Sequence, residues 1–419
     1  MSKLTYHKFA NLYQMASGIS SKPEQAGHGA AFLSFSTVFN NYFLPNEFID
    51  RMDTSEQEQK KCSINEGDVF LTRTSEVIDE LGMSSVALKN YQHATYSGFL
   101  KRLRPIQEKV TYPKFMAFYL RSSLFRKTMT NNAVLTLRAS LNEDIFSYLD
   151  LILPEYGDQV KAGDFLYLLS QKIDCNNRIN AELEAMAKTL YDYWFVQFDF
   201  PDANGKPYKS SGGKMVYNTT LKREIPAGWT DSNILAVADL LGGGTPTKKK
   251  PEYWNGSMPF FTPTDADGSI FKFATADYIT EEGLKGSSTK LFGKNTVFIT
   301  ARGSVGKLVF AGVDMAMNQS CYALRAKPGI SHIYLFFLTK ELIHHLQVKS
   351  SGSVFDSIVS NDIEFSTLAI PDSNVIKKFA AAVEPAFEKI ANNTKENQHL
   401  TQLRDWLLPM LMNGQVTVE

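Results

Sequence analysis

The sequence predicts an α+β fold: two α/β domains separated by two long helices that form an antiparallel coiled coil, with a pseudo-twofold internal repeat. Three observations favour it: an ungapped internal alignment, a seven-residue periodicity in the aligned segments, and short β-rich runs upstream of each. Residues 149–195 align with residues 366–412, so that Pro154 falls on Pro371 at a separation of 217 positions (371 minus 154). Each half is therefore a variable globular domain followed by a segment of fixed length.

Both aligned segments carry the period of a coiled-coil helix, and the second repeats the phase of the first. Asn176 and Asn393 occupy matching positions, where a buried Asn costs stability but fixes register and partner choice. The alternative is two amphipathic helices packed on their own domains, which would need neither matched lengths nor matched polar positions. The expected helix seam comprises Leu169, Asn176, Ile179, Leu183, Met186, Leu190, Asn393, Leu400, Leu403 and Leu407.

The globular parts read as mixed α/β with many strands. Residues 69–71 and 297–299 are short β-rich runs next to turn residues. They lie 228 positions apart (297 minus 69), not 217, so the two globular parts differ in length. Residues 242–246 must form a loop because they combine three glycines with a proline, and residues 199–214 read as a linker.

Composition sets outer limits on the function. The 419 residues predict two to three domains, and 43% hydrophobic residues are enough for substantial cores. The formal net charge of zero argues mildly against a free-standing nucleic-acid binder, but not against one that shares its DNA with a basic partner. Three scattered cysteines and the absence of a signal peptide or a long apolar run lead us to expect a soluble, cytoplasmic protein.

Four stretches together resemble the specificity subunit of type I restriction–modification systems. They are residues 190–209; residues 225–229 with 244–246 and 253–256; residues 301–307; and residues 403–414. They span roughly residues 155–419, whereas the first 150 residues match only in general plan. That difference is expected of a first recognition domain, because the family changes its target by varying this part of the sequence.

The resemblance implies two target-recognition domains, residues 1–154 and 225–371, which each read one half of a bipartite DNA site. It also implies a central conserved helix (155–198), a linker (199–224) and a C-terminal conserved helix (372–419). Such a subunit is not catalytic. Its implied partners are double-stranded DNA, two methyltransferase subunits and restriction subunits, and no cofactor, metal or membrane is expected.

Basic and polar residues on expected loops are the candidates for DNA contact. Lysine and arginine suit phosphate contacts, and arginine is also the commonest reader of guanine. The competing interpretation is a solvated charge run for Lys248–Lys250 and a plain structural turn for residues 301–307. The candidates are Arg73, Lys101, Arg102, Arg104, Arg121, Arg126, Lys127, Lys248, Lys249, Lys250, Thr262, Thr264, Arg302, Ser304, Lys307, Ser351 and Ser353.

Catalytic candidates are few. Residues 301–307 superficially resemble a phosphate-binding P-loop, but Ala301 and Leu308 stand where that motif needs Gly and Ser or Thr. His344 and His345 have no partner at metal-ligand spacing and read as an exposed helix feature. The leading hypothesis is therefore a DNA-recognition subunit; the rivals are a coiled-coil scaffolding adaptor without DNA specificity and a nuclease with an unrecognised site.

Overall fold

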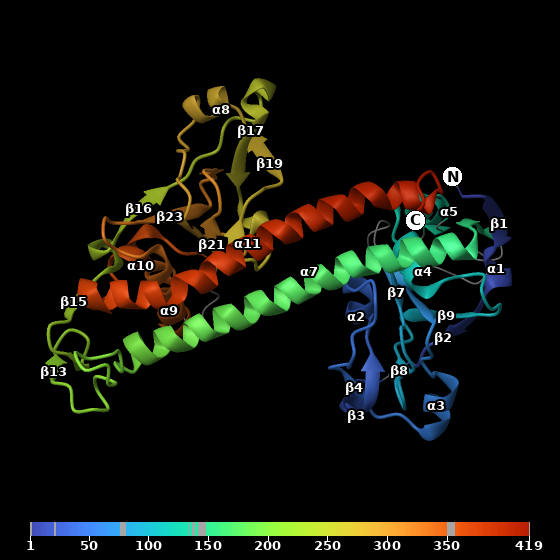
Figure 1. Ribbon diagram of the computed structural model, residues 1–419, viewed down its shortest axis with the longest axis horizontal. Helices are drawn as coiled ribbons and strands as arrows, with labels where there is room; N and C mark the ends of the chain where they lie inside the picture. The colour runs from blue at the N-terminus through green and yellow to red at the C-terminus, as the bar shows by residue number, and fades with distance from the viewer. Residues whose placement is uncertain are drawn as a thin grey trace. The chain divides into compact units, whose positions relative to one another are not determined.

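The structure is a computed structural model that describes residues 2–20, 22–75, 81–132, 134–135, 139–140, 148–349 and 357–418. The chain forms two compact units. The first unit comprises Met1–Ile173 and His399–Glu419, and the second comprises Asp174–Gln398. Two long helices, α7 (Tyr156–Tyr191) and α11 (Ser373–Met412), each have one end in the first unit and the other end in the second (Figure 1). No helix in the described part of the chain is long and apolar enough to cross a membrane.

The first unit contains small sheets flanked by short helices. Its four-stranded sheet has the order β2 (Tyr13–Ser17), β9 (Leu100–Pro105), β5 (Val69–Thr72), β7 (Ser84–Val86). The other sheets pair β4 (Arg51–Met52), β3 (Ala26–Leu33) and β8 (Thr95–Tyr96); β1 (Leu4–Lys8) and β12 (Asp150–Pro154); and β10 (Val134–Leu135), β11 (Ala139–Ser140) and β6 (Thr74–Ser75). Its helices include α1 (Phe9–Leu12), α2 (Phe35–Asn40), α3 (Glu56–Lys61), α4 (Pro113–Tyr119) and α5 (Ser123–Asn132).

The second unit repeats this plan with a larger sheet. Its five-stranded sheet has the order β16 (Ala238–Gly242), β23 (Cys321–Ala326), β20 (Val297–Thr300), β21 (Leu308–Ala311), β18 (Phe271–Lys272). The smaller sheets pair β19 (Asp277–Ile279), β17 (Trp254–Phe261) and β22 (Ala316–Met317); β15 (Thr230–Ser232) and β24 (Leu368–Ile370); and β13 (Met215–Asn218) and β14 (Arg223–Pro226). Its helices include α8 (Glu281–Lys285), α9 (His332–Lys349) and α10 (Ser360–Glu364).

The internal repeat extends through both globular parts, beyond what the sequence alignment reached. The strand order β2-β9-β5-β7 corresponds to β16-β23-β20-β21, with every pair antiparallel. Strand β3 has an antiparallel partner with a register shift and a parallel partner, and β17 has the same two kinds of partner. The predicted α+β class with two long helices and a repeat is confirmed, as are the strand predictions at residues 69–71 and 297–299.

The long helices anchor each unit by burying apolar side chains at one end. In the first unit, Leu166 of α7 and Leu411 of α11 join a core that includes Phe115, Phe118 and Leu151. In the second unit, the last turn of α7 and the π-helical residues that follow it bury an aromatic group against α9 and α11. These aromatic residues are Tyr191, Trp194, Phe195, Phe337 and Phe379.

The helix pairing differs from the predicted seam in one respect. Asn176 and Asn393 are buried as expected, and Leu183 and Leu190 are partly buried. Met186 and Leu403, however, are 68% and 39% exposed, so placing them in the seam was wrong. The inward positions of α7 are Asn176, Asn180, Leu183, Ala187 and Leu190, buried or half-buried at alternating steps of four and three residues, because a helix turns every 3.6 residues.

The segment predicted as a linker is folded. Asp199 accepts hydrogen bonds from the Ser210 backbone amide at 2.7 Å and from the Ser210 hydroxyl at 2.5 Å. The ring of Phe200 stacks on Tyr208 with 4.7 Å between centroids. Strands β13 and β14 then form a hairpin within the second unit. Residues 199–226 are thus held in a defined structure by contacts within the segment, despite their polar and glycine-rich composition.

Candidate nucleic-acid interface

Four turns meet at the end of the five-stranded sheet in the second unit: residues 243–250, 262–265, 301–307 and 318–320. The Thr245 hydroxyl bonds to the Gln319 side chain. The Arg302 amide donates to the Ser320 carbonyl at 3.3 Å, and the Asn318 amide donates to the Phe261 carbonyl at 3.0 Å. We call this group of turns the second loop cluster.

Glycine permits the close approach on which the second loop cluster depends. A Cβ atom on Gly243 would lie 2.2 Å from the Asn318 carbonyl oxygen, closer than a side chain could tolerate. The next amide, that of Gly244, donates to the Met317 carbonyl at 3.1 Å. The glycine run predicted as a loop therefore serves to bring two backbones together.

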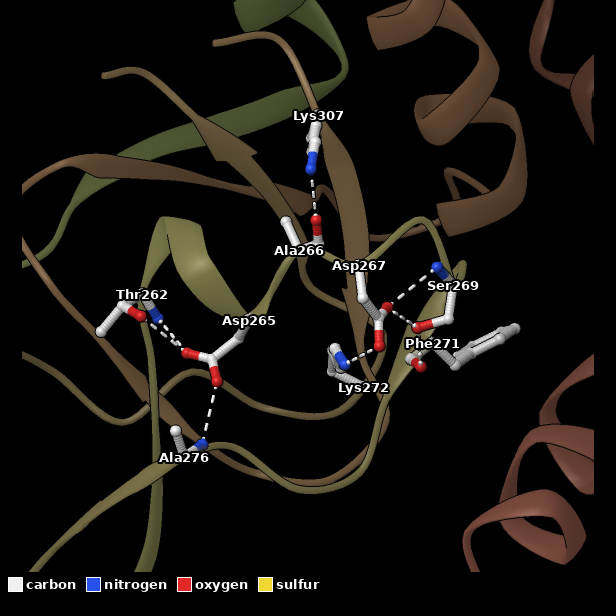
Figure 2. A network of polar contacts seen from close by, with 9 residues as sticks. All are labelled: Thr262, Asp265, Ala266, Asp267, Ser269, Phe271, Lys272, Ala276 and Lys307. Atoms are coloured by element: carbon white, nitrogen blue, oxygen red, sulfur yellow. Dashed lines mark hydrogen bonds and ion pairs between the residues drawn. The ribbon is translucent and has the colours of Figure 1, made fainter. Parts of the chain in front are cut away.

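Asp265 holds the 262–265 turn in place from a buried position (Figure 2). Its Oδ2 accepts from both the Thr262 amide and the Thr262 hydroxyl at 2.8 Å, and its Oδ1 accepts from the Ala276 amide at 2.9 Å. The Thr262 and Thr264 hydroxyls lie 2.7 Å apart. Both candidate threonines thus stand on a turn that Asp265 makes rigid.

Asp267 forms a second, more exposed polar centre on the same stretch (Figure 2). Its carboxylate accepts from Lys272 Nζ at 2.6 Å and from the Ser269 hydroxyl at 2.7 Å. Partial burial opposes ionisation of Asp267, but these bonds outweigh it and lower the pKa of the carboxyl. The charges of Asp267 and Lys272 are therefore mutually satisfied.

Residues 301–307 form a β-hairpin turn between β20 and β21, as the turn hypothesis predicted, and not a strand-to-helix P-loop. Gly303 and Gly306 adopt positive φ values of 79° and 84°. The Thr300 Oγ1 accepts from the Lys307 amide at 2.9 Å, and Lys307 Nζ donates to the Ala266 carbonyl at 2.6 Å. Lys307 therefore ties this hairpin to the turn beside Asp265 (Figure 2).

Exposed polar and basic side chains project from this rigid base. Arg302, Ser304, Lys248 and Lys249 are all exposed. Lys250 is exposed as well, but its Nζ donates to the Tyr253 hydroxyl at 3.0 Å. The second loop cluster therefore offers both flexible cations for phosphate and short polar side chains for base edges.

The first unit builds the same arrangement from different residues. The Ile19 amide donates to the Tyr96 carbonyl at 3.0 Å, as the Gly244 amide does to Met317. A Cβ atom on Gly18 would lie 2.3 Å from the Ser97 carbonyl oxygen, which matches the close approach at Gly243. Residues 17–20, 72–75 and 97–99 therefore form what we call the first loop cluster.

Hydrogen bonds at the ends of the two central strands match as well. The Thr72 Oγ1 accepts from the Met83 amide at 2.9 Å, as the Thr300 Oγ1 does from Lys307. The Arg73 amide donates to the Phe99 carbonyl at 2.8 Å, as the Ala301 amide does to Ser320 at 2.8 Å. Arg73 is exposed, and the Phe99 ring beside it is 63% exposed.

Three predicted DNA contacts of the first unit are internal instead. Lys101 and Arg102 are only 6% and 7% exposed. Lys101 Nζ donates to the Ser17 hydroxyl at 2.8 Å, and Arg102 donates to the Ser63 carbonyl at 2.7 Å. Arg104 forms a two-point ion pair with the fully buried Asp68, at 2.8 and 2.7 Å. The expectation that Lys101, Arg102 and Arg104 contact DNA is corrected, because strand β9 turns these side chains into the protein.

The predicted helical face of Arg121, Arg126 and Lys127 does not exist, because Arg121 lies in the turn between α4 and α5. The Arg121 guanidinium donates to the carbonyls of Ser84 at 2.6 Å, Val38 at 2.7 Å, and Phe39 and Asn41 at 2.9 Å. Burial lowers the pKa of Arg121 to about 10. Arg126 donates to the Leu81 carbonyl, so only Lys127 remains an exposed candidate in this group.

The other predictions have mixed outcomes. Ser350–Ser353, including Ser351 and Ser353, lie outside the described residues. His344 and His345 are exposed on α9, as expected. Among the described residues, no group of three or more His, Cys, Asp or Glu side chains could hold a metal ion.

Sequence reasoning missed the polar turns that complete each loop cluster. Thr245, Asn318 and Gln319 belong to the second loop cluster, while Ser20 and Phe99 belong to the first. The available signal was a short polar run directly after an apolar strand, as in Asn318–Ser320 after β22. Without the strand order, nothing in the sequence joins that run to Arg302.

Comparison with known proteins assigns the chain to a family. A family model described as "Type I restriction modification DNA specificity domain" matches residues 29–185 and again residues 226–402. The chain is 24% identical over 374 residues to the Type I restriction enzyme MjaIX specificity subunit of Methanocaldococcus jannaschii, covering 87% of this chain and 82% of that protein. It is also 24% identical over 438 residues to the HindI specificity subunit of Haemophilus influenzae, covering 92% and 94%.

A solved structure shares the fold. The S subunit of a type I restriction–modification system from M. genitalium has a TM-score of 0.58 and 12% identity, covering 98% of this chain and 96% of that one. The two matches to the family model span well over half of the residues. The chain belongs to the family of type I restriction–modification DNA specificity proteins.

Proposed function

We propose that this protein is the non-catalytic DNA-recognition subunit of a type I restriction–modification enzyme. One observation carries the proposal: a rigid loop cluster with exposed polar and basic side chains occurs at equivalent strand ends in both units. Each cluster reads one half of a bipartite site, residues 1–154 and 225–371 being the two recognition domains. The family's DNA specificity domain, matched twice along the chain, supports this division.

The two kinds of side chain have different tasks. Lys248 and Lys249 are flexible cations on a loop and neutralise phosphates, which gives affinity without sequence information. Arg302, Ser304 and Thr264 stand on turns fixed by backbone hydrogen bonds and contact base edges. In the first loop cluster, Arg73 and Phe99 are the residues that contact base edges.

Catalysis belongs to other subunits. The relatives are named as specificity subunits of type I restriction enzymes. We therefore propose that this chain binds two methyltransferase subunits and restriction subunits, and acts in the cytoplasm where its DNA substrate lies. The conserved helices within residues 155–198 and 372–419 dock these partners and set the spacing between the half-sites.

The test is DNA binding by the chain alone and with its methyltransferase partners, each measured against specific and competitor DNA. Because the net charge is zero, the isolated chain should bind weakly, and the partners should tighten binding greatly. Picomolar specific binding by the isolated chain would contradict the need for partners. A complete complex without any sequence preference would contradict the proposed function.

A further inference from the structure

Four asparagines form a hydrogen-bonded cluster between α7 and α11 inside the second unit. Asn176 and Asn393 are each only 1% exposed. Asn176 Nδ2 donates to Asn397 Oδ1 at 2.9 Å and to Glu396 Oε2 at 2.8 Å. Asn393 Nδ2 donates to Asn180 Oδ1 at 2.9 Å. We call Asn176, Asn180, Asn393 and Asn397 the asparagine cluster.

The asparagine cluster obeys the internal twofold repeat. The sequence repeat places Asn176 on Asn393 and Asn180 on Asn397. The bond from Asn176 to Asn397 and the bond from Asn393 to Asn180 are therefore the same interaction made twice. In each, a buried Asn side chain donates to a half-buried Asn on the opposite helix. The acceptor lies four residues, about one turn, after the residue that is equivalent to the donor. The two contacts also show that α7 and α11 run antiparallel here.

The apolar residues next to the asparagine cluster do not select this alignment, although the contacts of Tyr191 and Trp194 with Phe379 of α11 also oppose a shift. Apolar side chains recur every seven residues along both helices, so a shift of seven residues again brings apolar side chains level with each other. The asparagines do not tolerate the shift. In one direction it would bring Asn176 level with Ile390, and in the other it would bring Asn393 level with Ala187. In either case a buried amide would lose its partner.

We propose that the asparagine cluster is a register lock, which permits a single axial alignment of α7 against α11. Its consequence for DNA rests on the proposed function: one alignment of the helices allows one spacing between the two half-sites. Asn176 and Asn393 are positioning residues that touch no DNA. They trade stability for a unique alignment, as a buried polar pair does in other helix pairs.

The alignment can be measured in the full chain without DNA. Spin labels on Thr189→Cys and Asn392→Cys, both exposed positions, report the distance between the helices in a Cys175→Ser background. The other two cysteines, Cys62 and Cys321, are buried. With the asparagine cluster intact we expect one narrow distance. In Asn176→Leu/Asn393→Leu we expect a second distance, because a slip of seven residues, at about 1.5 Å each, moves one helix along the other by roughly 10 Å.

A matched control separates register from added apolar surface. Glu182→Leu/Glu388→Leu changes one exposed polar residue on each helix, and should keep the single distance. A folded Asn176→Leu/Asn393→Leu protein with one unchanged distance would overturn the proposal. Should that variant fail to fold, Asn180→Leu/Asn397→Leu decides instead, since it removes the two acceptors: a second distance supports the lock, and a single unchanged one refutes it.

The consequence for DNA is a separate readout. In cells with the partner subunits, Asn176→Leu/Asn393→Leu should methylate the same half-sites at more than one spacing, the minor spacing within about tenfold of the major one, a factor equal to about 1.4 kcal/mol. Two distances with one spacing would show that the lock exists but does not control DNA. If the variant shows two distances but the unaltered protein supports no sequence-specific methylation, the lock stands and only the proposed function is contradicted.

Discussion

Arg104 and Arg325 occupy equivalent positions in the two halves, and their surroundings give them different roles. Each lies on the strand next to the first strand of its sheet, opposite Gln14 in one unit and Asp239 in the other. Arg104 pairs with Asp68, whose side chain is completely buried. Arg325 pairs with Asp239 at 2.9 Å, but these side chains are 62% and 42% exposed. The same strand position thus carries a core ion pair in one unit and a surface ion pair in the other.

This difference teaches how to read basic residues in the two globular parts. In the first unit the cations on strand β9 and in the turn before α5 donate to internal acceptors, so they hold the fold together. In the second unit the cations Lys248, Lys249 and Arg302 lie on turns and are exposed. A basic residue at a loop tip is therefore a candidate for DNA contact, whereas one within a strand must first be checked for a buried partner.

The largest effect is expected from breaking the core pair. Arg104→Ala should lower the free energy of unfolding by about 3 kcal/mol, because it leaves the Asp68 carboxylate buried without its cation. Urea denaturation measures the loss. Arg325→Ala is the matched control and should cost less than about 1 kcal/mol, since its ion pair is exposed. Equal losses in the two variants would refute the contrast drawn between the units.

Arg121→Met should cost about 2 kcal/mol, because it leaves carbonyl oxygens of the first unit without their donor. Its specific DNA affinity, measured in the complete complex below the melting temperature, should be unchanged. A loss of affinity without a loss of stability would restore Arg121 as a DNA contact. Lys127→Met, at an exposed position nearby, should not alter stability measurably.

Arg302→Ala should weaken specific binding at least about tenfold and relax the sequence preference of one half-site only, with stability unchanged. Arg73→Ala should have the corresponding effect on the other half-site. Competition binding with half-site variants of the DNA measures both. Arg325→Ala, which alters an exposed ion pair near the end of β23 that is farther from Ser320, serves as the control. If Arg302→Ala affects both half-sites equally, the assignment of one cluster to each half-site fails.

Lys248→Ala and Lys249→Ala should have the smallest effect. Each should weaken binding to all DNA sequences alike and reduce the slope of log affinity against log salt by about one, as expected for a phosphate contact. Salt titrations of the complex on specific and nonspecific DNA give this slope. A change in sequence preference would instead assign these lysines to base edges.

Much of the architecture could be predicted because it depends on local patterns. The repeat, the two long helices, the strands at residues 69–71 and 297–299 and the buried Asn176 and Asn393 all follow from spacing in the sequence. Met186 and Leu403 were misplaced because a seven-residue period cannot tell which neighbouring position faces inward in a straight helix.

The site was harder to predict because it depends on contacts between distant segments. Lys101 and Arg102 look like a basic patch in the sequence, and only the pairing of β9 with β2 and β5 shows that they are enclosed. Arg302 was identified from its glycine-rich turn, but its neighbours Gln319 and Thr245 were not. No sequence pattern joins these three, since the strand order brings them together.

Replacing residues 1–150 with the corresponding part of another family member tests the central claim most directly. Methylome sequencing of cells that carry this hybrid and its partner subunits reports both half-sites at once. If each loop cluster reads its own half-site, only one half of the methylated motif changes, and the half read through the second unit remains. A motif changed in both halves, or in neither, would contradict the account.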